Sequence, residues 1–454
     1  MMPRALMVQG TSSGAGKSLL ATALCRSFRR RGVDVAPFKA QNMSNNARVV
    51  AGGEIGTAQY LQALASGVEP DVRMNPVLVK PEGDNRSQVV VLGKLDLELS
   101  RLAWRERGPK LWPTVQAALM SLQAEHELIV LEGAGSPAEI NLRDTDLANM
   151  RSAAAADARV LLVADIDRGG AFAHLVGTWS LLDDVDRRRI DGFVLNKFRG
   201  DASLLPPAPA LVEELTGVPT IGVLPWLRHR LPDEDGAFVT GAASAGPVVA
   251  VVRYPTASNL DELKPLEQVA QVRWVQRPGD LDGADLVVLP GSKHVAADLA
   301  WLRETAIAAA LAVSSAPLLG ICGGMQLLGR ELVDDAGVDG SGPGLGLLPV
   351  RTVFRKRKRV GTVSVRFDEL EEPWSALSNL GFEGYEIRHG DMPSVAASGR
   401  VLGVAAHGMF ESGDVMRALF GAAPAAALDG VFDELADAVE THLDLDRFVA
   451  PVVR

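Results

Sequence analysis

A glycine-rich segment near the N-terminus constrains the fold more than any other feature of the sequence. An apolar run at residues 5–8 leads into Gly-Thr-Ser-Ser-Gly-Ala-Gly-Lys-Ser at residues 10–18, and a helical stretch follows at residues 19–30. The backbone N–H groups of such a loop cradle phosphates at the start of a helix. The order of strand, loop and helix therefore predicts a nucleotide-binding α/β domain.

The residues of this loop have separate expected roles. The backbone around Gly14 and Gly16 is expected to cradle the phosphates of a nucleotide. Lys17 would reach the outer phosphates, and the hydroxyl of Ser18 would bind Mg²⁺. The strict form of the motif has glycine at the position of Thr11, so this loop is a variant.

The variant resembles the loop of the dethiobiotin synthetase group. The ParA/MinD-type partition ATPases also use a variant loop, but theirs carries a lysine near its start, which this chain lacks. Enzymes of the dethiobiotin synthetase group phosphorylate a carboxylate, and a nitrogen then attacks the acyl phosphate. The resemblance implies an ATP-dependent synthetase domain.

Short apolar runs alternate with helical stretches along the whole chain. The apolar runs lie at residues 5–8, 33–38, 128–131, 160–164, 192–195 and 220–224, and again at 248–252, 271–275, 286–289, 318–321, 361–367 and 401–405. Continuous apolar strands that alternate with helices are typical of parallel sheets covered on both faces. The sequence therefore predicts an α/β fold.

One segment interrupts this alternation. Residues 231–247 are rich in Asp, Gly, Ala and Ser, as linkers are, and a chain of 454 residues is too long for one ordinary core. We therefore predict four parts: a synthetase domain at residues 1–235, a linker at 236–247, a second α/β domain at 248–440 and a C-terminal tail at 441–454.

Charge and hydropathy favour a cytoplasmic protein that acts on small molecules. The net charge of -10 argues against broad nucleic-acid binding. The apolar runs are all shorter than the roughly 18 residues that a membrane span needs. The first of them leads directly into the glycine-rich loop, which leaves no room for a signal peptide.

Polar residues follow several apolar runs of the first half. Lys39 would neutralise phosphate charge, and Glu132 is a natural partner for Mg²⁺, which prefers carboxylates and phosphates. Asp165 would bind metal or position a substrate, and the amide of Asn196 would read an adenine edge. A guanine-reading pattern would need Asp in place of Arg199, so we expect ATP.

The second half carries a cysteine in a glycine-rich turn. The apolar run at residues 318–321 leads into Cys322, which is followed by two glycines. This pattern is typical of a nucleophile elbow, in which the start of a helix lowers the thiol pKa. Cys25, in contrast, lies at apolar spacing inside the helical stretch 19–30 and is expected to be a core residue.

A cysteine nucleophile needs a base and an oxyanion hole. His407 follows the apolar run at residues 401–405 and is the expected base, with His389 as the runner-up. The backbone N–H groups of Gly291 and Gly323 are the expected oxyanion donors. This arrangement resembles class I glutamine amidotransferases, although their His-Pro-Glu segment, whose glutamate orients the histidine, is absent here.

Several long segments resemble the CobB/CobQ family, and specifically its CobQ branch. They are Phe-Lys-Ala-Gln-Asn-Met-Ser-Asn-Asn at residues 38–46, Arg-Met-Asn-Pro-Val-Leu-Val-Lys-Pro at 73–81, Glu-Gly-Ala-Gly-Ser-Pro-Ala-Glu-Ile-Asn-Leu at 132–142, Asp-Ile-Asp-Arg-Gly-Gly at 165–170 and Asn-Lys-Phe-Arg-Gly at 196–200. The resemblance covers nearly the whole chain. The chain departs from the family pattern at Arg388, where relatives have histidine.

The resemblance implies an amidation of a corrinoid. Glutamine would supply ammonia, and ATP would activate the b, d, e and g carboxylates of adenosylcobyrinic acid a,c-diamide to give adenosylcobyric acid. Two alternatives stay open at this point. One is amidation of another carboxylate, either to form cobyrinate a,c-diamide or on a cell-wall precursor, and the other is a P-loop switch protein.

Overall fold

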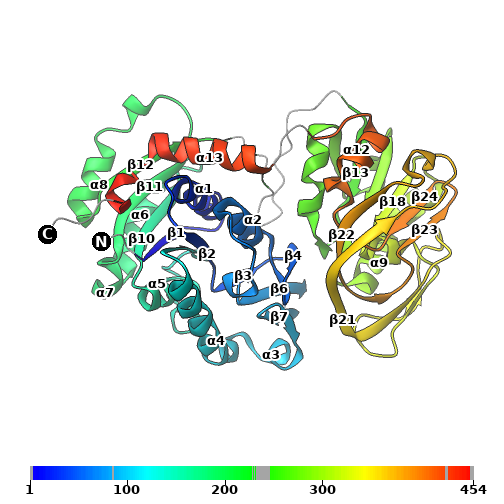
Figure 1. Ribbon diagram of the computed structural model, residues 1–454, viewed down its shortest axis with the longest axis horizontal. Helices are drawn as coiled ribbons and strands as arrows, with labels where there is room; N and C mark the ends of the chain where they lie inside the picture. The colour runs from blue at the N-terminus through cyan, green and yellow to red at the C-terminus, as the bar shows by residue number, and fades with distance from the viewer. Residues whose placement is uncertain are drawn as a thin grey trace.

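The first domain of the computed structural model is built on a parallel sheet (Figure 1). The structure describes residues 4–83, 86–227, 229, 231, 246–424 and 428–449. In spatial order the strands are β12 (Thr220–Pro225), β11 (Ile190–Phe198), β10 (Arg159–Asp165), β1 (Ala5–Gly10), β9 (Leu128–Glu132) and β2 (Val35–Phe38). All neighbouring strands are parallel, and each coincides with a predicted apolar run.

Helices cover both faces of this sheet, because alternate side chains of a strand point to opposite faces. Leu6 and Val8 of β1 belong to the core formed with α1 and α13, whereas Ala5 and Met7 belong to the core formed with α4, α5 and α6. The helices are α1 (Lys17–Arg30), α2 (Thr57–Ser66), α3 (Leu97–Arg101), α4 (Trp104–Glu125), α5 (Met150–Ala156), α6 (Ala171–Leu181), α7 (Asp184–Arg187), α8 (Ala208–Thr216) and α13 (Leu428–His442). The predicted two-sided α/β arrangement is confirmed.

Short strands extend the first domain toward the second. One small sheet has the order β3, β6, β7 and β8, and a separate hairpin pairs β4 with β5. Their bounds are β3 (Gln41–Met43), β4 (Ala47–Val50), β5 (Gly53–Gly56), β6 (Val77–Gly83), β7 (Arg86–Val91) and β8 (Lys94–Asp96). The hairpin β4–β5 lies between α2 and the second domain (Figure 1).

The second domain has its own mostly parallel sheet. Its strands, in spatial order, are β15 (Gln271–Val275), β13 (Val248–Val252), β16 (Leu286–Leu289), β18 (Leu318–Ile321), β24 (Val401–Val404) and the antiparallel β23 (Val395–Ser398). One face packs on α9 (Val295–Glu304), α10 (Ile307–Val313) and α11 (Gly323–Leu328), and the other on α12 (Gly413–Phe420) and the 3-10 helix η4 (Leu260–Gln268). The predicted α/β class is therefore confirmed here also.

A long antiparallel pair, β21 (Arg351–Arg366) with β22 (Gly381–Asp391), completes this domain. The predicted strand at residues 361–367 is the second half of β21, in a sheet with the order β20 (Gly342–Pro343), β19 (Glu331–Val333), β21 and β22. Residues 236–245 of the predicted linker and 450–454 of the predicted tail lie outside the described residues. In the described ranges, no helix has the length and apolar content that a membrane crossing requires.

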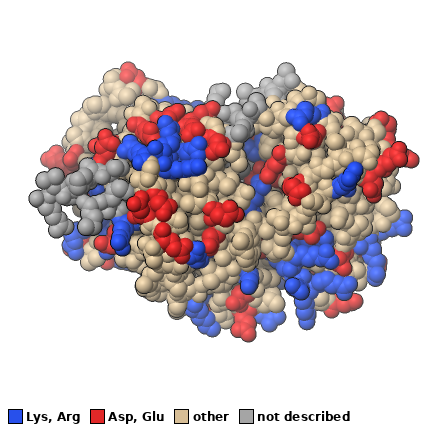
Figure 2. Space-filling model, in the orientation of Figure 1, with Lys and Arg blue, Asp and Glu red and all other residues tan. Residues whose placement is uncertain are grey.

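Helix α13 falls within the range predicted for the second domain, yet it packs against α1 of the first (Figure 1). Its aspartates repeat every four residues and pair with the arginines of α1, as Arg26 does with Asp433 at 2.8 Å and Arg30 with Asp437 at 2.6 Å. Basic and acidic side chains gather together over these two helices in Figure 2. Its apolar face, including Phe432, is buried in the core of the first domain.

We expect Phe432→Ala to destabilise the first domain by about 3–5 kcal/mol, because it deletes a fully buried ring. Hydrogen exchange followed by mass spectrometry should show faster exchange in α1, with no change in β18 and β24. Asp429→Ala is the matched control on the same helix, since it removes an exposed ion pair worth at most about 1 kcal/mol. Faster exchange confined to the second domain would contradict this packing.

Candidate active sites

The glycine-rich loop connects β1 to α1 in a backbone form that only glycine adopts easily. Gly14 has φ 71° and Gly16 has φ 96°, both in the left-handed region. A Cβ atom on Gly16 would also lie 2.0 Å from Nδ2 of Asn196. This nitrogen donates to the carbonyl of Ala15 at 2.8 Å. Asn196 therefore supports the loop from β11, and its reading of an adenine edge stays a prediction.

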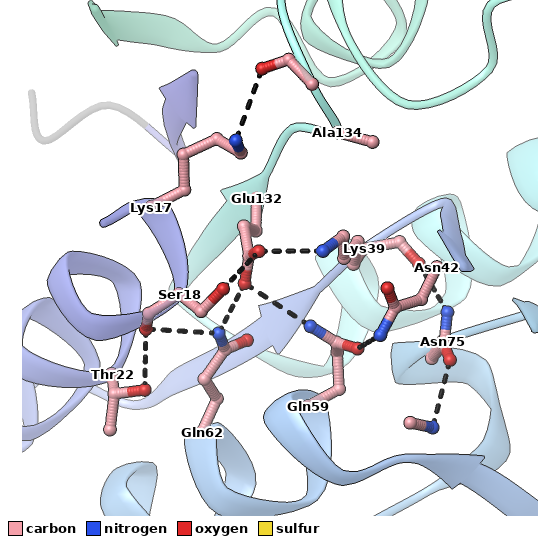
Figure 3. A network of polar contacts seen from close by, with 12 residues as sticks. Lys17, Ser18, Thr22, Lys39, Asn42, Gln59, Gln62, Asn75, Glu132 and Ala134 are labelled. Atoms are coloured by element: carbon pink, nitrogen blue, oxygen red, sulfur yellow. Dashed lines mark hydrogen bonds and ion pairs between the residues drawn. The ribbon is translucent and has the colours of Figure 1, made fainter. Parts of the chain in front are cut away.

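Lys17 and Ser18 begin α1 and reach groups at the end of β9 (Figure 3). The Nζ atom of Lys17 donates to the carbonyls of Ser12 at 3.0 Å and Gly135 at 3.2 Å, so it lies across the loop. The hydroxyl of Ser18 donates to Oε1 of Glu132 at 2.8 Å. The parallel order of β1 and β9 brings these side chains together, as the sequence predicts.

Glu132 is almost fully buried and accepts from four side chains (Figure 3). Besides Ser18, Lys39 donates to Oε1 at 2.8 Å, and Gln62 and Gln59 donate to Oε2 at 2.6 Å and 3.3 Å. A buried carboxylate needs such partners to offset its lost hydration. Neither glutamine was predicted from the sequence. Their signal was a pair of amides three residues apart on an otherwise apolar helix, α2.

The acidic residue at the end of β10 is already paired with basic groups. Asp165 accepts from Nζ of Lys197 at 2.9 Å and lies 3.4 Å from Nε of Arg168. The described residues contain no group of three or more His, Cys, Asp or Glu side chains arranged to hold a metal ion. An ion held by Ser18 and Glu132 would thus take its other ligands from phosphate and water, as Mg²⁺ commonly does.

A pocket of about 670 Å³ opens above these groups. Its wall includes the glycine-rich loop, Lys39, Asn196, residues 41–44 and Asn46 of the first domain. On the far side it reaches Asp261 of the second domain. The pocket therefore spans from the phosphate loop to the junction of the two domains.

In the second domain, Cys322 sits in a strained turn between β18 and α11. Its φ of 51° and ψ of -105° are unusual for any residue with a side chain. The flanking glycines permit the turn, because a Cβ on Gly324 would lie 1.9 Å from the carbonyl oxygen of Leu289, and one on Gly323 would lie 2.3 Å from the nitrogen of Ser292. This is the geometry of a nucleophile elbow.

His407 follows β24, and its ring interacts with the side chain of Cys322. On the other side of the ring, Nδ1 lies 2.7 Å from Oε1 of Glu262, and the second oxygen of Glu262 accepts from the backbone of Gly408 at 2.9 Å. Cys322, His407 and Glu262 thus form a buried triad. His389, the runner-up, instead bonds the carbonyl of Arg355 with its Nδ1.

Glu262 contacts the ring of His407 and was not predicted from the sequence. It lies on η4, far from His407 in sequence, in place of the glutamate that many class I amidotransferases carry just after their histidine. Burial disfavours the charged ring, but Glu262 and Cys322 outweigh it and raise the pKa of His407 to about 10. The ring therefore carries a proton at neutral pH and can stabilise a thiolate.

The two predicted oxyanion residues lie on adjoining loops beside this triad. Gly291 begins β17 (Gly291–Ser292), and a Cβ there would lie 3.0 Å from Cε1 of His407. Gly323 packs against the backbone of Ser292. Their amides are thus near the elbow, and their role in holding an oxyanion stays a prediction.

Comparison with known proteins matches both halves of the chain. Residues 6–234 match the CobQ/CobB/MinD/ParA nucleotide binding domain, and residues 248–415 match the CobB/CobQ-like glutamine amidotransferase domain. The cobyric acid synthase of Polaromonas sp. (strain JS666) is 52% identical over 98% of this chain and 97% of its own length. Those of Variovorax paradoxus and Paracidovorax citrulli are 53% and 54% identical, each over 98% of both chains.

The chain belongs to the cobyric acid synthase family. This confirms the resemblance to the CobQ branch and the two functional halves, a nucleotide-binding one and a glutamine amidotransferase one. It also confirms that the chain is an amide-forming ligase rather than a switch protein. Arg388, the departure from the family pattern, is buried in β22, where it donates to Glu386 at 2.7 Å and to the carbonyl of Gly390.

We expect Glu262→Gln to lower the rate of glutamine hydrolysis by about 10²–10⁴-fold, because His407 loses the carboxylate that orients it and stabilises its charge. The raised pKa of His407 keeps its proton up to high pH, so losing Glu262 should move the alkaline limb of the kcat/KM profile for glutamine to lower pH. Glu267→Gln is the matched control, since Glu267 lies on the same 3-10 helix and pairs with Lys264. An unchanged alkaline limb would contradict the triad.

Proposed function

We propose that this protein amidates the b, d, e and g carboxylates of adenosylcobyrinic acid a,c-diamide to give adenosylcobyric acid, with glutamine as the nitrogen donor and one ATP consumed per amide. The observation that carries the proposal is the similarity to cobyric acid synthases over nearly the whole of both chains. The two sites described above supply chemistry that such a reaction needs.

Glutamine hydrolysis is assigned to the second domain. The thiolate of Cys322 attacks the side-chain carboxamide, and the amides of Gly291 and Gly323 stabilise the oxyanion. His407 donates its proton to the departing ammonia, while Glu262 stabilises the charged ring. Water, deprotonated by His407, then cleaves the thioester to release glutamate. The buried position of the triad favours transfer of ammonia within the protein rather than through solvent.

Activation of the carboxylate is assigned to the first domain. Gly14, Gly16 and Lys17 bind the phosphates, and Lys39 adds positive charge beside them. Ser18 and the carboxylate Glu132 offer oxygen ligands that fit Mg²⁺, which would neutralise phosphate charge when bound. The γ-phosphate passes to the substrate carboxylate, and ammonia displaces phosphate from the acyl phosphate. The pocket that extends from the loop to the domain junction is the proposed place of this step.

Cys322→Ala should lower glutamine-dependent amidation by roughly 10³-fold or more, because it removes the proposed nucleophile. Activity with added ammonium should stay within about twofold of the unmodified protein, since the nucleotide site is untouched. Cys25→Ala is the control for the other thiol, which is buried in α1 with its pKa raised to about 12 by burial. Loss of both activities in Cys322→Ala would refute the two-site scheme.

Incubation with ATP, Mg²⁺, glutamine and adenosylcobyrinic acid a,c-diamide should lower the corrinoid mass in successive steps of one unit, one for each acid converted to an amide. Mass spectrometry of the corrinoid checks this, and parallel reactions with cobyrinic acid and with a cell-wall precursor test the other acceptors. Glutamine hydrolysis without any change in corrinoid mass would reject the corrinoid and retain the amidotransferase.

A further inference from the structure

A buried arginine of the first domain reaches across the domain junction. Arg48 lies on β4, is only 9% exposed, and bonds acidic residues of the second domain. Its Nε donates to Oδ2 of Asp261 at 2.9 Å, and its Nη2 lies 2.7 Å from the same oxygen. Its Nη1 pairs with Glu411. A planar guanidinium held by two carboxylates has a fixed orientation, so Arg48 ties β4 to the second domain at two points.

Both carboxylates that Arg48 holds are next to parts of the glutaminase triad. Asp261 immediately precedes Glu262, the residue that orients His407. Glu411 lies in the 3-10 helix η7 (Met409–Glu411), which begins directly after His407 and Gly408. Arg48 therefore fixes the chain on both sides of the hydrogen bond between the carboxylate and the ring.

A third contact runs through an aromatic ring. The guanidinium of Arg48 lies 5.1 Å from the ring centre of Tyr385, and that ring stacks on His407 with the ring centres 5.3 Å apart. The backbones of Tyr385 and His407 also exchange hydrogen bonds, at 3.1 Å and 2.9 Å. The hydroxyl of Tyr385 accepts from Asn259 at 3.2 Å. Arg48 thus contacts Tyr385, the residue whose ring and backbone support His407.

The same arginine is also connected to the nucleotide site. Its guanidinium lies 5.8 Å from the ring centre of Tyr60 on α2, and Thr57 at the start of that helix donates to Asp261 at 3.3 Å. Helix α2 carries the two glutamines that hold Glu132. A series of contacts through α2, Asp261 and Arg48 therefore connects Glu132 to the glutaminase triad.

We propose that Arg48 is a positioning residue through which the first domain aligns His407 for glutamine hydrolysis. The second domain supplies the triad, and Arg48 of the first domain contacts the residues that hold the triad in place. Glutamine hydrolysis is then fast only while the two domains are docked through Arg48 and Asp261. The inference rests on the proposed use of glutamine but not on the identity of the acceptor.

The test is Arg48→Met in the full chain, which keeps the length of the side chain and removes its charge and its planar donors. The kcat for glutamine hydrolysis should fall about 10–100-fold with little change in KM, since alignment of the base rather than glutamine binding is lost. Arg48→Lys should recover only part of the loss, because an ammonium cannot make the planar contacts. Nucleotide binding, measured by calorimetry, should stay within about twofold in both variants, as should amidation with added ammonium.

Arg107→Met is the matched control. Arg107 is also a buried arginine of the first domain over an aromatic ring, that of Trp104, but it donates hydrogen bonds to Ser87, Ser100 and Leu102 of its own domain. The Arg107→Met variant should have an unchanged kcat for glutamine hydrolysis. An unchanged kcat in Arg48→Met, or an equal loss of hydrolysis and nucleotide binding, would overturn the proposal. If the corrinoid is not the acceptor, only the assay of amidation with added ammonium shows no product. Glutamine hydrolysis and nucleotide binding then still decide the role of Arg48.

Discussion

A parallel sheet gathers the carboxyl ends of its strands along one edge, and both active sites of this chain depend on that constraint. In the first domain the edge brings the phosphate loop after β1 beside Glu132 at the end of β9. In the second it brings Cys322 after β18 beside His407 after β24. Residues that are distant in sequence meet because the strands before them are neighbours. The chemistry of each half therefore follows from strand order.

Within each site, a buried carboxylate holds the reactive groups in place. Glu132 and Glu262 are both nearly inaccessible to water, and burying a charge without partners is costly. Each is instead surrounded by donors: side chains around Glu132, and the ring of His407 with the amide of Gly408 around Glu262. Because every oxygen is engaged, the partners have little freedom to turn. The two sites are thus preorganised by the same physical device.

The sequence predicted the strands and the glycine-rich turns well, because these depend on local patterns. Apolar runs locate strands, and a glycine-rich turn that contains Lys17 or Cys322 needs its glycines for close backbone approach. The partners that hold these groups were harder to predict. Glu262 and the glutamines of α2 lie in segments without a recognisable motif, and their roles arise only when the chain is folded. The packing of α13 on α1 was missed for the same reason.

The sequence by itself determined the α/β class, the phosphate loop, the glycine-rich turn at Cys322 and the family, since each of these depends on consecutive residues or on a repeating period. Tertiary structure alone decided which carboxylate orients His407 and which residues enclose Glu132. It also decided that Arg48 of one domain touches the supports of the base in the other. These contacts join residues 70 to 363 positions apart in the chain, and a local sequence pattern does not specify which distant side chains the fold will bring together.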